Sequence, residues 1–325
     1  MAGYNTIRGL RVKYLSADPA NAENGQVWYN STTGNLRVEG IQGAGTWASG
    51  ANYPTTFVSG SGGGNISAGW VTAGGSNTAT FKYDGSSWTS TGALNTWRAG
   101  AGSAGSQTAG LIFAGSTSPA PSPSGRNNIT EEFNGSSWSE QNDMAQTRDS
   151  LAGCGTQTAA LGAAGFISGP YPSGSTQVVE EYNGSSWTSA NSVPGSSGKA
   201  GLTAAGIQTA AITVGGGPSN TNVSSEYDGT NWTSAPNYPT PAAAMASGGT
   251  QNDAIFNGTG GSGTTTALYN GTAWASQNEN AQGRHATGYM GQGAAEVTMS
   301  GGTPGSISAT EEFTLPLGTA NITTS

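Results

Sequence analysis

The sequence is short of the residue types that metal and catalytic sites most often use. Its 325 residues include one cysteine, Cys154, and one histidine, His285. A single cysteine excludes an intramolecular disulfide and a cysteine-rich zinc site. A single histidine argues against a metal centre built on several imidazoles. We expect Cys154 to be a small buried strand residue and His285 to lie on a strand surface, so neither predicts a metal, a cofactor or a catalytic group.

Charge is also scarce. Charged residues make up 9% of the chain, and 10 basic against 18 acidic residues give a net charge of -8. Nucleic acid is not an expected partner, because phosphate backbones are bound by basic patches and no Lys/Arg cluster occurs. The N-terminus lacks the apolar core of a signal peptide, and no apolar run reaches about 18 residues. We therefore expect neither signal-peptide secretion nor membrane insertion.

Glycine and aromatic residues, by contrast, are abundant. The chain has 54 Gly, 9 Trp, 11 Tyr and 7 Phe, and the regular spacing of the aromatics favours order over disorder. A motif of aromatic, Asn/Asp-Gly, two further residues and Trp occurs five times in steps of 42 to 50 residues. This period predicts one four-stranded propeller blade per repeat. The copies begin at Tyr83, Phe133, Tyr182, Tyr227 and Tyr269 and end at Trp88, Trp138, Trp187, Trp232 and Trp274.

Each copy reads as a β-hairpin. The aromatic ends one strand, Asn-Gly or Asp-Gly makes a tight turn with positive φ, and Trp lies on the return strand. We expect the aromatics to pack between neighbouring blades, with a ligand-stacking platform as the alternative. A second, glycine-rich hairpin recurs around Gln107, Gln157, Gln208 and Gln251. Its small residues suit inner strands near a propeller axis, where backbones approach closely.

The two ends of the chain carry complementary parts of a sixth copy. Trp47 lacks a preceding turn, whereas Thr310-Glu-Glu-Phe313 matches Thr130-Glu-Glu-Phe133 but lacks a following Trp. We predict that both ends share one blade, which closes an all-β, six-bladed ring and removes its free edges. A seventh blade is the alternative if a hairpin at 27–34 joins the ring. The expected boundaries are 1–42 for an N-terminal segment with a β-hairpin, 43–316 for the propeller and 317–325 for a C-terminal tail.

The order of motifs resembles the kelch repeat. After four of the five Trp residues comes a basic position, held by Arg98, Arg148, Lys199 and Arg284, and then the hairpin ending in glycines. After Trp232 this position is held by apolar or small residues, Pro241 to Ala244. The segment from Leu10 to Val38, and the Tyr-Asn-Gly-Ser-Ser-Trp repeats, resemble tail-fibre and other structural proteins of tailed bacteriophages, particularly marine cyanobacterial ones. The resemblance implies a virion protein, assembled in the host cytoplasm. Its N-terminal segment would bind other virion proteins, and its propeller would be displayed for host recognition and adhesion.

Variable connections should emerge on one face of the ring, where repeat proteins often bind ligands. The two longest span 116–129 and 166–178, and their large polar side chains are Arg126 and Tyr171. We predict that these two residues anchor a host-surface glycan or protein, with mere spacers as the alternative. The acidic pairs Glu131-Glu132, Glu180-Glu181 and Glu311-Glu312 recur at one strand position, which indicates a structural role rather than acid/base catalysis.

The sequence therefore favours a non-enzymatic protein. An intracellular kelch-type protein-interaction scaffold is the alternative, and a glycan-active enzyme is the third hypothesis. The motif Asp84-Gly-Ser-Ser-Trp88 resembles a sialidase Asp-box only superficially, because glycine follows the aspartate directly. The sequence leaves the oligomeric state open, since a closed propeller needs no partner for its stability.

Overall fold

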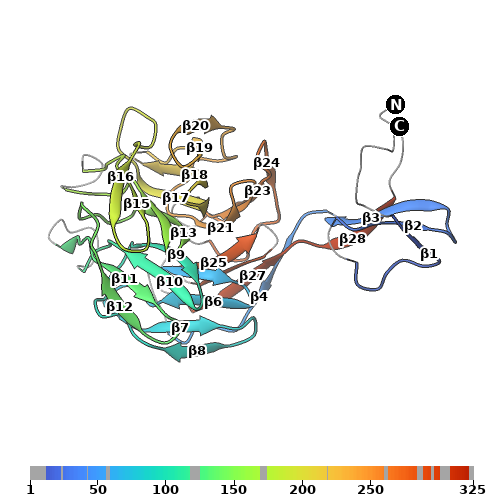
Figure 1. The fold of residues 1–325 in the computed structure, drawn as a ribbon, viewed down its shortest axis with the longest axis horizontal. Coiled ribbons are helices and arrows are strands. Elements are labelled where there is room, and N and C mark those ends of the chain that lie inside the picture. Colours follow the sequence, from blue (N-terminus) through green and yellow to red (C-terminus); the bar gives the residue numbers. More distant parts are fainter. Residues whose placement is uncertain are drawn as a thin grey trace. The chain divides into compact units, whose positions relative to one another are not determined.

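The computed structural model describes residues 12–22, 25–41, 43–55, 59–117, 125–168, 174–217, 219–259, 263–283, 288–293, 296–300 and 308–321. In this part of the chain the regular structure is β-strand, arranged in seven four-stranded sheets (Figure 1). The same residues contain no helix long and apolar enough to cross a membrane. The chain divides into two compact units, residues 46–314 and residues 1–45 with 315–325.

The larger unit contains five blades made of consecutive strands, numbered here 1 to 5. Blade 1 has β5 (Gly62–Asn65), β6 (Ala68–Thr72), β7 (Thr80–Tyr83) and β8 (Trp88–Thr91). Blade 2 has β9 (Gly102–Ser106), β10 (Ala109–Phe113), β11 (Thr130–Phe133) and β12 (Trp138–Gln141). Blade 3 has β13 (Ala152–Thr156), β14 (Ala159–Ala163), β15 (Val179–Tyr182) and β16 (Trp187–Ala190). Blade 4 has β17 (Ala200–Ile207), β18 (Ala210–Gly217), β19 (Ser224–Tyr227) and β20 (Trp232–Ala235). Blade 5 has β21 (Ala246–Thr250), β22 (Asp253–Asn257), β23 (Thr266–Tyr269) and β24 (Trp274–Ser276).

Blade 6 is shared between the two ends of the chain, as the sequence predicted. It contains β25 (Gly288–Gly293), β26 (Glu296–Ser300), β27 (Thr310–Thr314) and β4 (Thr46–Ser49). Strand β27 pairs antiparallel with β4, and Phe313 lies opposite Trp47. The inner strands contact one another in the order β5, β9, β13, β17, β21, β25 and back to β5, so the ring is closed. The prediction of an all-β, six-bladed propeller is therefore confirmed.

The repeated motif forms the outer hairpin of each blade. In blade 1, Tyr83 lies opposite Trp88, and Asp84, Gly85, Ser86 and Ser87 form the turn. The Oδ1 atom of Asp84 accepts hydrogen bonds from the backbone N–H groups of Ser86 and Ser87, at 2.9 and 2.8 Å. Gly85 adopts φ +91°, which explains the glycine in every copy. The turn is thus a four-residue loop capped by the Asp or Asn side chain, with the positive φ on glycine alone.

The inner hairpins require glycine for a second reason. Gly105 adopts φ +91°, and a Cβ atom there would lie 2.1 Å from the carbonyl oxygen of Ala109. Gly155 is in the same position in blade 3, with φ +112° and a distance of 2.3 Å to the carbonyl oxygen of Ala159. Close approach of paired backbones therefore accounts for these glycines.

A row of residues in the left-handed conformation lies where the inner strands of blades 1 to 5 begin. The backbone N–H of Gly100 donates to the carbonyl of Ser59, Ser150 donates to Gly100, Gly201 to Ser150, and Ala244 to Gly201, at 2.7 to 3.2 Å. All five residues have φ between +49° and +66°. We call these five residues the axial collar. It links blades 1 to 5 through the backbone alone.

The smaller unit is a separate sheet in the order β1 (Lys13–Leu15), β2 (Val27–Asn30), β3 (Asn35–Ile41) and β28 (Leu317–Asn321). The hairpin expected near 27–34 is present as β2 and β3, but it belongs to this sheet. The alternative of a seventh blade was therefore wrong. The expected tail at 317–325 also needs correction, because residues 317–321 pair with β3 along its length. The amino-acid sequence after Phe313 has no repeat motif that would have indicated this strand.

Candidate functional site

The tryptophans of the repeat connect each blade to the preceding one. Trp138 Nε1 donates to Thr80 Oγ1 at 3.0 Å, and Trp187 Nε1 donates to Thr130 Oγ1 at 2.9 Å. Trp47, in blade 6, donates to Thr266 Oγ1 in blade 5. Backbone carbonyls accept in the other three cases, from Trp88 to Ala51, from Trp232 to Asn191 and from Trp274 to Pro236. All six indole N–H groups are thus used inside the ring, which favours packing over a ligand-stacking platform.

The second glutamate of each acidic pair also joins neighbouring blades. Glu132 accepts a hydrogen bond from the hydroxyl of Tyr182 at 3.0 Å, and Glu181 accepts one from Tyr227 at 2.8 Å. Glu226 and Tyr269 repeat the contact at 2.8 Å, and Tyr83 donates to Glu312 where blade 1 meets blade 6. Burial and the nearby carboxylates raise the pKa of these tyrosines, so the phenols stay protonated donors.

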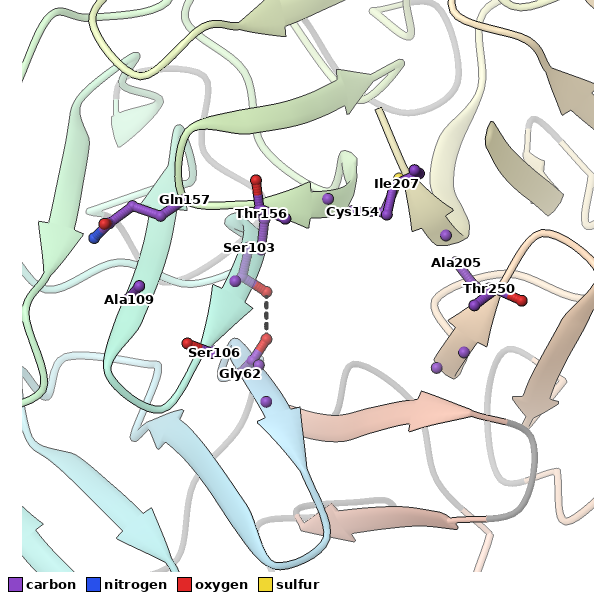
Figure 2. Close-up of a pocket in the computed structure, with 18 of the residues that line it drawn as sticks. Gly62, Ser103, Ser106, Ala109, Cys154, Thr156, Gln157, Ala205, Ile207 and Thr250 are labelled. Carbon is purple, nitrogen blue, oxygen red and sulfur yellow. Dashed lines mark hydrogen bonds between the residues drawn. The ribbon is translucent and has the colours of Figure 1, made fainter. Parts of the chain in front are cut away.

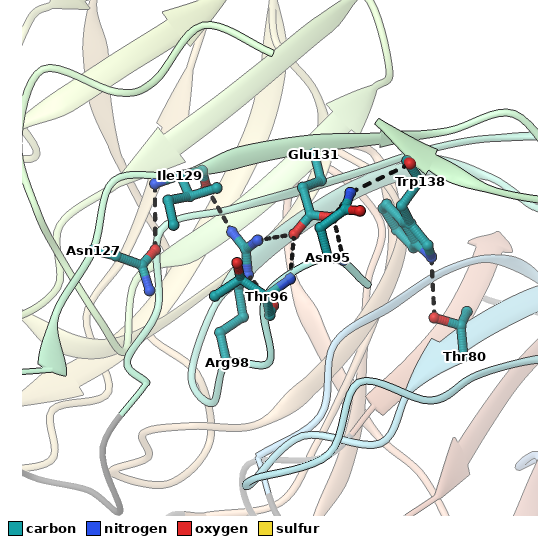
Figure 3. Close-up of polar contacts among 8 residues, drawn as sticks. All are labelled: Thr80, Asn95, Thr96, Arg98, Asn127, Ile129, Glu131 and Trp138. Atoms are coloured by element: carbon teal, nitrogen blue, oxygen red, sulfur yellow. Dashed lines mark hydrogen bonds and ion pairs between the residues drawn. The ribbon is translucent and has the colours of Figure 1, made fainter. Parts of the chain in front are cut away.

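The first glutamate of the pair is buried within its own blade (Figure 3). In blade 2, the guanidinium of Arg98 forms an ion pair with Glu131 and donates to the carbonyl of Ile129 at 2.7 Å. The second carboxylate oxygen of Glu131 accepts the backbone N–H of Asn95 at 2.9 Å. Blade 3 repeats this arrangement, with Arg148 Nη2 at 2.8 Å from Glu180 Oε1. These side chains are fully buried, so two of the basic positions serve the fold rather than a ligand.

The first glutamate of the pair is present only in blades where the chain segment leading into the blade can donate a backbone N–H to it. The carboxylate accepts a backbone N–H from Asn95 in blade 2, from Ala145 in blade 3 and from Ala281 in blade 6. In the other three blades the corresponding residue is proline, which has no N–H. Those prolines are Pro54, Pro194 and Pro239, and the glutamate position is held by Phe81, Ser225 and Ala267. At this strand position a buried carboxylate therefore occurs only in blades whose preceding connection can donate a backbone N–H to it.

Arg126, predicted to anchor a ligand, forms its described contacts with other residues of the propeller. It is 9% exposed, and its Nε donates to Asp149 Oδ2 at 2.9 Å. Its guanidinium carbon lies 5.5 Å from the ring centroid of Phe166. These contacts connect the loop of blade 2 with the start of blade 3, which explains why an arginine is buried there. Tyr171, the other predicted anchor, lies outside the described residues, as do Arg284 and His285.

A cavity lies on the ring axis, at the turns of the inner hairpins (Figure 2). Its volume is about 420 Å³, and its described walls are mainly glycine, alanine, serine and threonine. Ser103 Oγ donates to the carbonyl of Gly62 at 2.8 Å, which joins two blades at the wall. Among the residues that line it there is no carboxylate, imidazole or basic side chain. Such walls offer neutral hydrogen-bonding groups only.

Cys154 also lines this cavity, but its thiol is not activated. It is 5% exposed in β13, and burial raises its pKa to about 12. A thiol is nucleophilic as the thiolate, so Cys154 is inert at neutral pH. Within the described ranges no group of three or more His, Cys, Asp or Glu residues could hold a metal ion. The described residues around this cavity therefore supply neither an activated thiol nor a metal cluster.

Comparison with known proteins agrees with the fold. No protein-family model and no curated protein matches the sequence. Solved structures do match, and the structure of YjhT is one of them. It shares 16% sequence identity with this chain at a TM-score of 0.67, and the match covers 84% of this chain and 99% of that one. At this identity the similarity shows the propeller fold alone.

Proposed function

We propose that the protein is a non-enzymatic structural protein of a tailed-phage particle, as a tail fibre or surface appendage. Its smaller unit attaches to other virion proteins, and its propeller is displayed for contact with a host-surface glycan or protein. The observation that carries this proposal is the connectivity. The propeller is inserted between β3 and β28, which pair with each other in the smaller unit. One attached unit thus holds the propeller by both of its chain ends.

The propeller suits a binding role better than a catalytic one. Its buried charged side chains, such as Arg98 with Glu131 and Arg126 with Asp149, form ion pairs that join segments of the ring. Backbone bonds of the axial collar and indole bonds between blades make the ring a rigid support. Loops on a rigid support bind a ligand with little loss of conformational entropy.

The protein composition of density-gradient-purified particles tests the proposal. We expect peptides from both units in stoichiometric amounts that stay with the particles through a high-salt wash. The purified protein should release no sugar from host-surface glycans. Absence from the particles would overturn the virion assignment, and glycan turnover that exceeds a heat-treated control would overturn the non-enzymatic one.

A further inference from the structure

The basic residue that leads into blade 4, Lys199, takes the same place in the fold as Arg148, which leads into blade 3. The backbone N–H of Lys199 donates to the carbonyl of Thr176 at 2.9 Å, and its carbonyl accepts from the N–H of Gly165 at 2.8 Å. Arg148 makes the equivalent two backbone bonds with residues of blade 2. The repeat therefore places both basic side chains in equivalent surroundings.

The two basic side chains differ in the partner that their blade supplies. Arg148 forms an ion pair with Glu180, which lies on the third strand of blade 3 opposite Ser189. The equivalent residue of blade 4 is Ser225, which is 4% exposed and carries no charge. Blade 4 therefore keeps the positive charge of the repeat and lacks the negative one.

Lys199 is left without a counter-ion. It is only 9% exposed, yet its amine forms no hydrogen bond or ion pair within the described ranges. The other four basic side chains in this part of the propeller each contact a carboxylate or a carbonyl oxygen, and they are Lys82, Arg98, Arg126 and Arg148. Burial lowers the pKa of Lys199, because an ammonium loses its hydration there. A negative group supplied from outside would therefore stabilise this side chain.

The end of the Lys199 side chain lies beside an exposed part of the chain. Its Cε atom is 3.6 Å from the position that a Cβ atom on Gly195 would take. Residues 194–197 are all exposed. The amide of Gln177 donates to the carbonyls of Val193 and Gly195 at 2.9 Å, which holds this connection against the loop of blade 3. A small ligand can therefore approach the amine from solvent along residues 194–197.

We propose that Lys199 binds the carboxylate of an acidic sugar, a hexuronate unit of a host-surface glycan. The ligand supplies the counter-ion that Glu180 supplies to Arg148. A carboxylate is favoured over a phosphate, because a single ammonium balances a single negative charge and the repeat itself pairs its basic position with a carboxylate in blades 2 and 3.

The groups around the amine favour a sugar over a protein partner. Gln177, Ser196 and Ser197 offer amide, hydroxyl and backbone groups, which are the polar groups that orient a small ligand. Protein interfaces depend instead on buried aromatic and apolar anchors. The choice of a glycan rests on the proposed display function, whereas the unpaired amine does not.

Isothermal titration calorimetry of the full chain tests the proposal. The probes are trigalacturonate and triglucuronate, with their methyl esters as uncharged controls of the same size. We expect at least one acid to bind, its ester to bind about 10-fold more weakly, and Lys199→Met to raise the dissociation constant by about 10-fold or more. The matched control is Lys82→Met, in which the lost amine donates to Gly135 of blade 2, and it should leave the dissociation constant unchanged.

A second measurement needs no variant. A saturating concentration of the bound acid should protect Lys199 from acetylation by an amine-reactive ester, as measured by mass spectrometry, and should leave Lys82 unprotected. Melting temperatures of Lys199→Met and Lys82→Met establish that both proteins are folded at the temperature of the titrations.

Four outcomes would overturn the binding of a hexuronate at Lys199. They are no binding of either acid at about 10 mM, esters that bind as tightly as the acids, equal effects of the two substitutions, or binding of triglutamate in place of the sugars. The last outcome would assign the amine to a protein partner. A chain that binds the acids through Lys199 but is absent from purified particles would contradict the virion role alone.

Discussion

Trp47 and Phe313 face each other across the ladder between β4 and β27, with ring centroids 5.1 Å apart, although they come from opposite ends of the chain. Their contact completes in blade 6 the same aromatic pair that Tyr83 and Trp88 form within one hairpin of blade 1. Ring closure therefore reuses the geometry of the repeat. Strand β4 protects an edge of β27 that would otherwise be open to pairing with other chains.

Two truncated chains test this role of β4. A chain of residues 46–314 keeps Trp47 and should unfold cooperatively as a soluble monomer. A chain of residues 50–314 lacks β4, so the open edge of β27 should make it aggregate and lower its melting temperature. Thermal unfolding followed by circular dichroism, together with light scattering, makes the comparison. Identical behaviour of the two chains would contradict the closure by β4.

The buried ion pair of blade 3 gives a second prediction. Arg148→Met should lower the free energy of unfolding by about 3–5 kcal/mol, because Glu180 is left buried without a positive partner. The double variant Arg148→Met/Glu180→Met should lose clearly less than the sum of the two single variants. Urea unfolding of the four proteins measures the coupling, and the exposed Glu140→Gln serves as a control expected within about 0.5 kcal/mol of wild type. Additive losses would mean that the two side chains act independently.

The exclusion of proline from the blades that carry the buried glutamate gives a third prediction. Asn95→Pro removes the backbone N–H that donates to Glu131, and it also removes the two side-chain hydrogen bonds of Asn95. It should cost about 1–3 kcal/mol more than Asn95→Ala, which removes only the two side-chain hydrogen bonds. Pro194→Ala in blade 4 should change stability little, because Ser225 occupies the glutamate position there. Both comparisons use urea unfolding. A tolerated Asn95→Pro would show that the backbone donor is dispensable.

The turn aspartates give a prediction on pH. Backbone N–H groups of Ser86 and Ser87 lower the pKa of Asp84 to about 2, and those of Asn231 and Thr230 lower the pKa of Asp228. Both carboxylates therefore stabilise the fold above their unfolded pKa near 4, and the contribution is lost as the pH falls toward 2. Other copies of the turn have asparagine, whose Oδ1 accepts the same bonds at any pH.

The variant Asp84→Asn/Asp228→Asn tests this prediction. Its melting temperature should equal that of wild type near neutral pH. Between about pH 4 and pH 2 its melting temperature should fall less than that of wild type. If the melting temperatures of the two proteins fall by the same amount with pH, these carboxylates do not contribute to the acid sensitivity.

Cys154 gives a prediction on reactivity. Its raised pKa and burial mean that the native thiol should resist alkylation at about pH 8, whereas the urea-unfolded chain should react at the rate of a free thiol. Mass spectrometry after a short exposure to iodoacetamide distinguishes the two states. Rapid labelling of the native protein would show that the axial cavity gives solvent and reagent access to the thiol.

Much of the propeller could be predicted because its signal is repeated. The aromatic and glycine positions recur in phase, so five weak hairpin motifs together specified the blades and their number. The split copy at Trp47 and Phe313 specified the closure. The axial collar could not be predicted, because Ser59, Ser150 and Ala244 take a left-handed conformation that only the surrounding backbone bonds impose.

The candidate site was harder to predict than the fold. Arg126 stands in a variable loop, and its sequence neighbourhood resembles a ligand anchor, whereas its partner Asp149 is supplied by the next blade. The strand 317–321 has no motif, and its pairing with β3 arises only when the ring brings both chain ends together. The role of Arg126 and the strand at 317–321 both depend on contacts between segments that are far apart in the sequence. A single sequence does not show which distant segments make contact.

The central claim is that the smaller unit attaches to a phage particle and the propeller is displayed. The most direct measurement is a density map of purified particles, supported by antibodies against residues 12–41 and against the propeller loops. The account predicts density for the sheet of the smaller unit against other virion proteins, with loops such as 219–223 accessible to antibody. A propeller packed against the particle with residues 12–41 exposed, or no density for the chain, would contradict it.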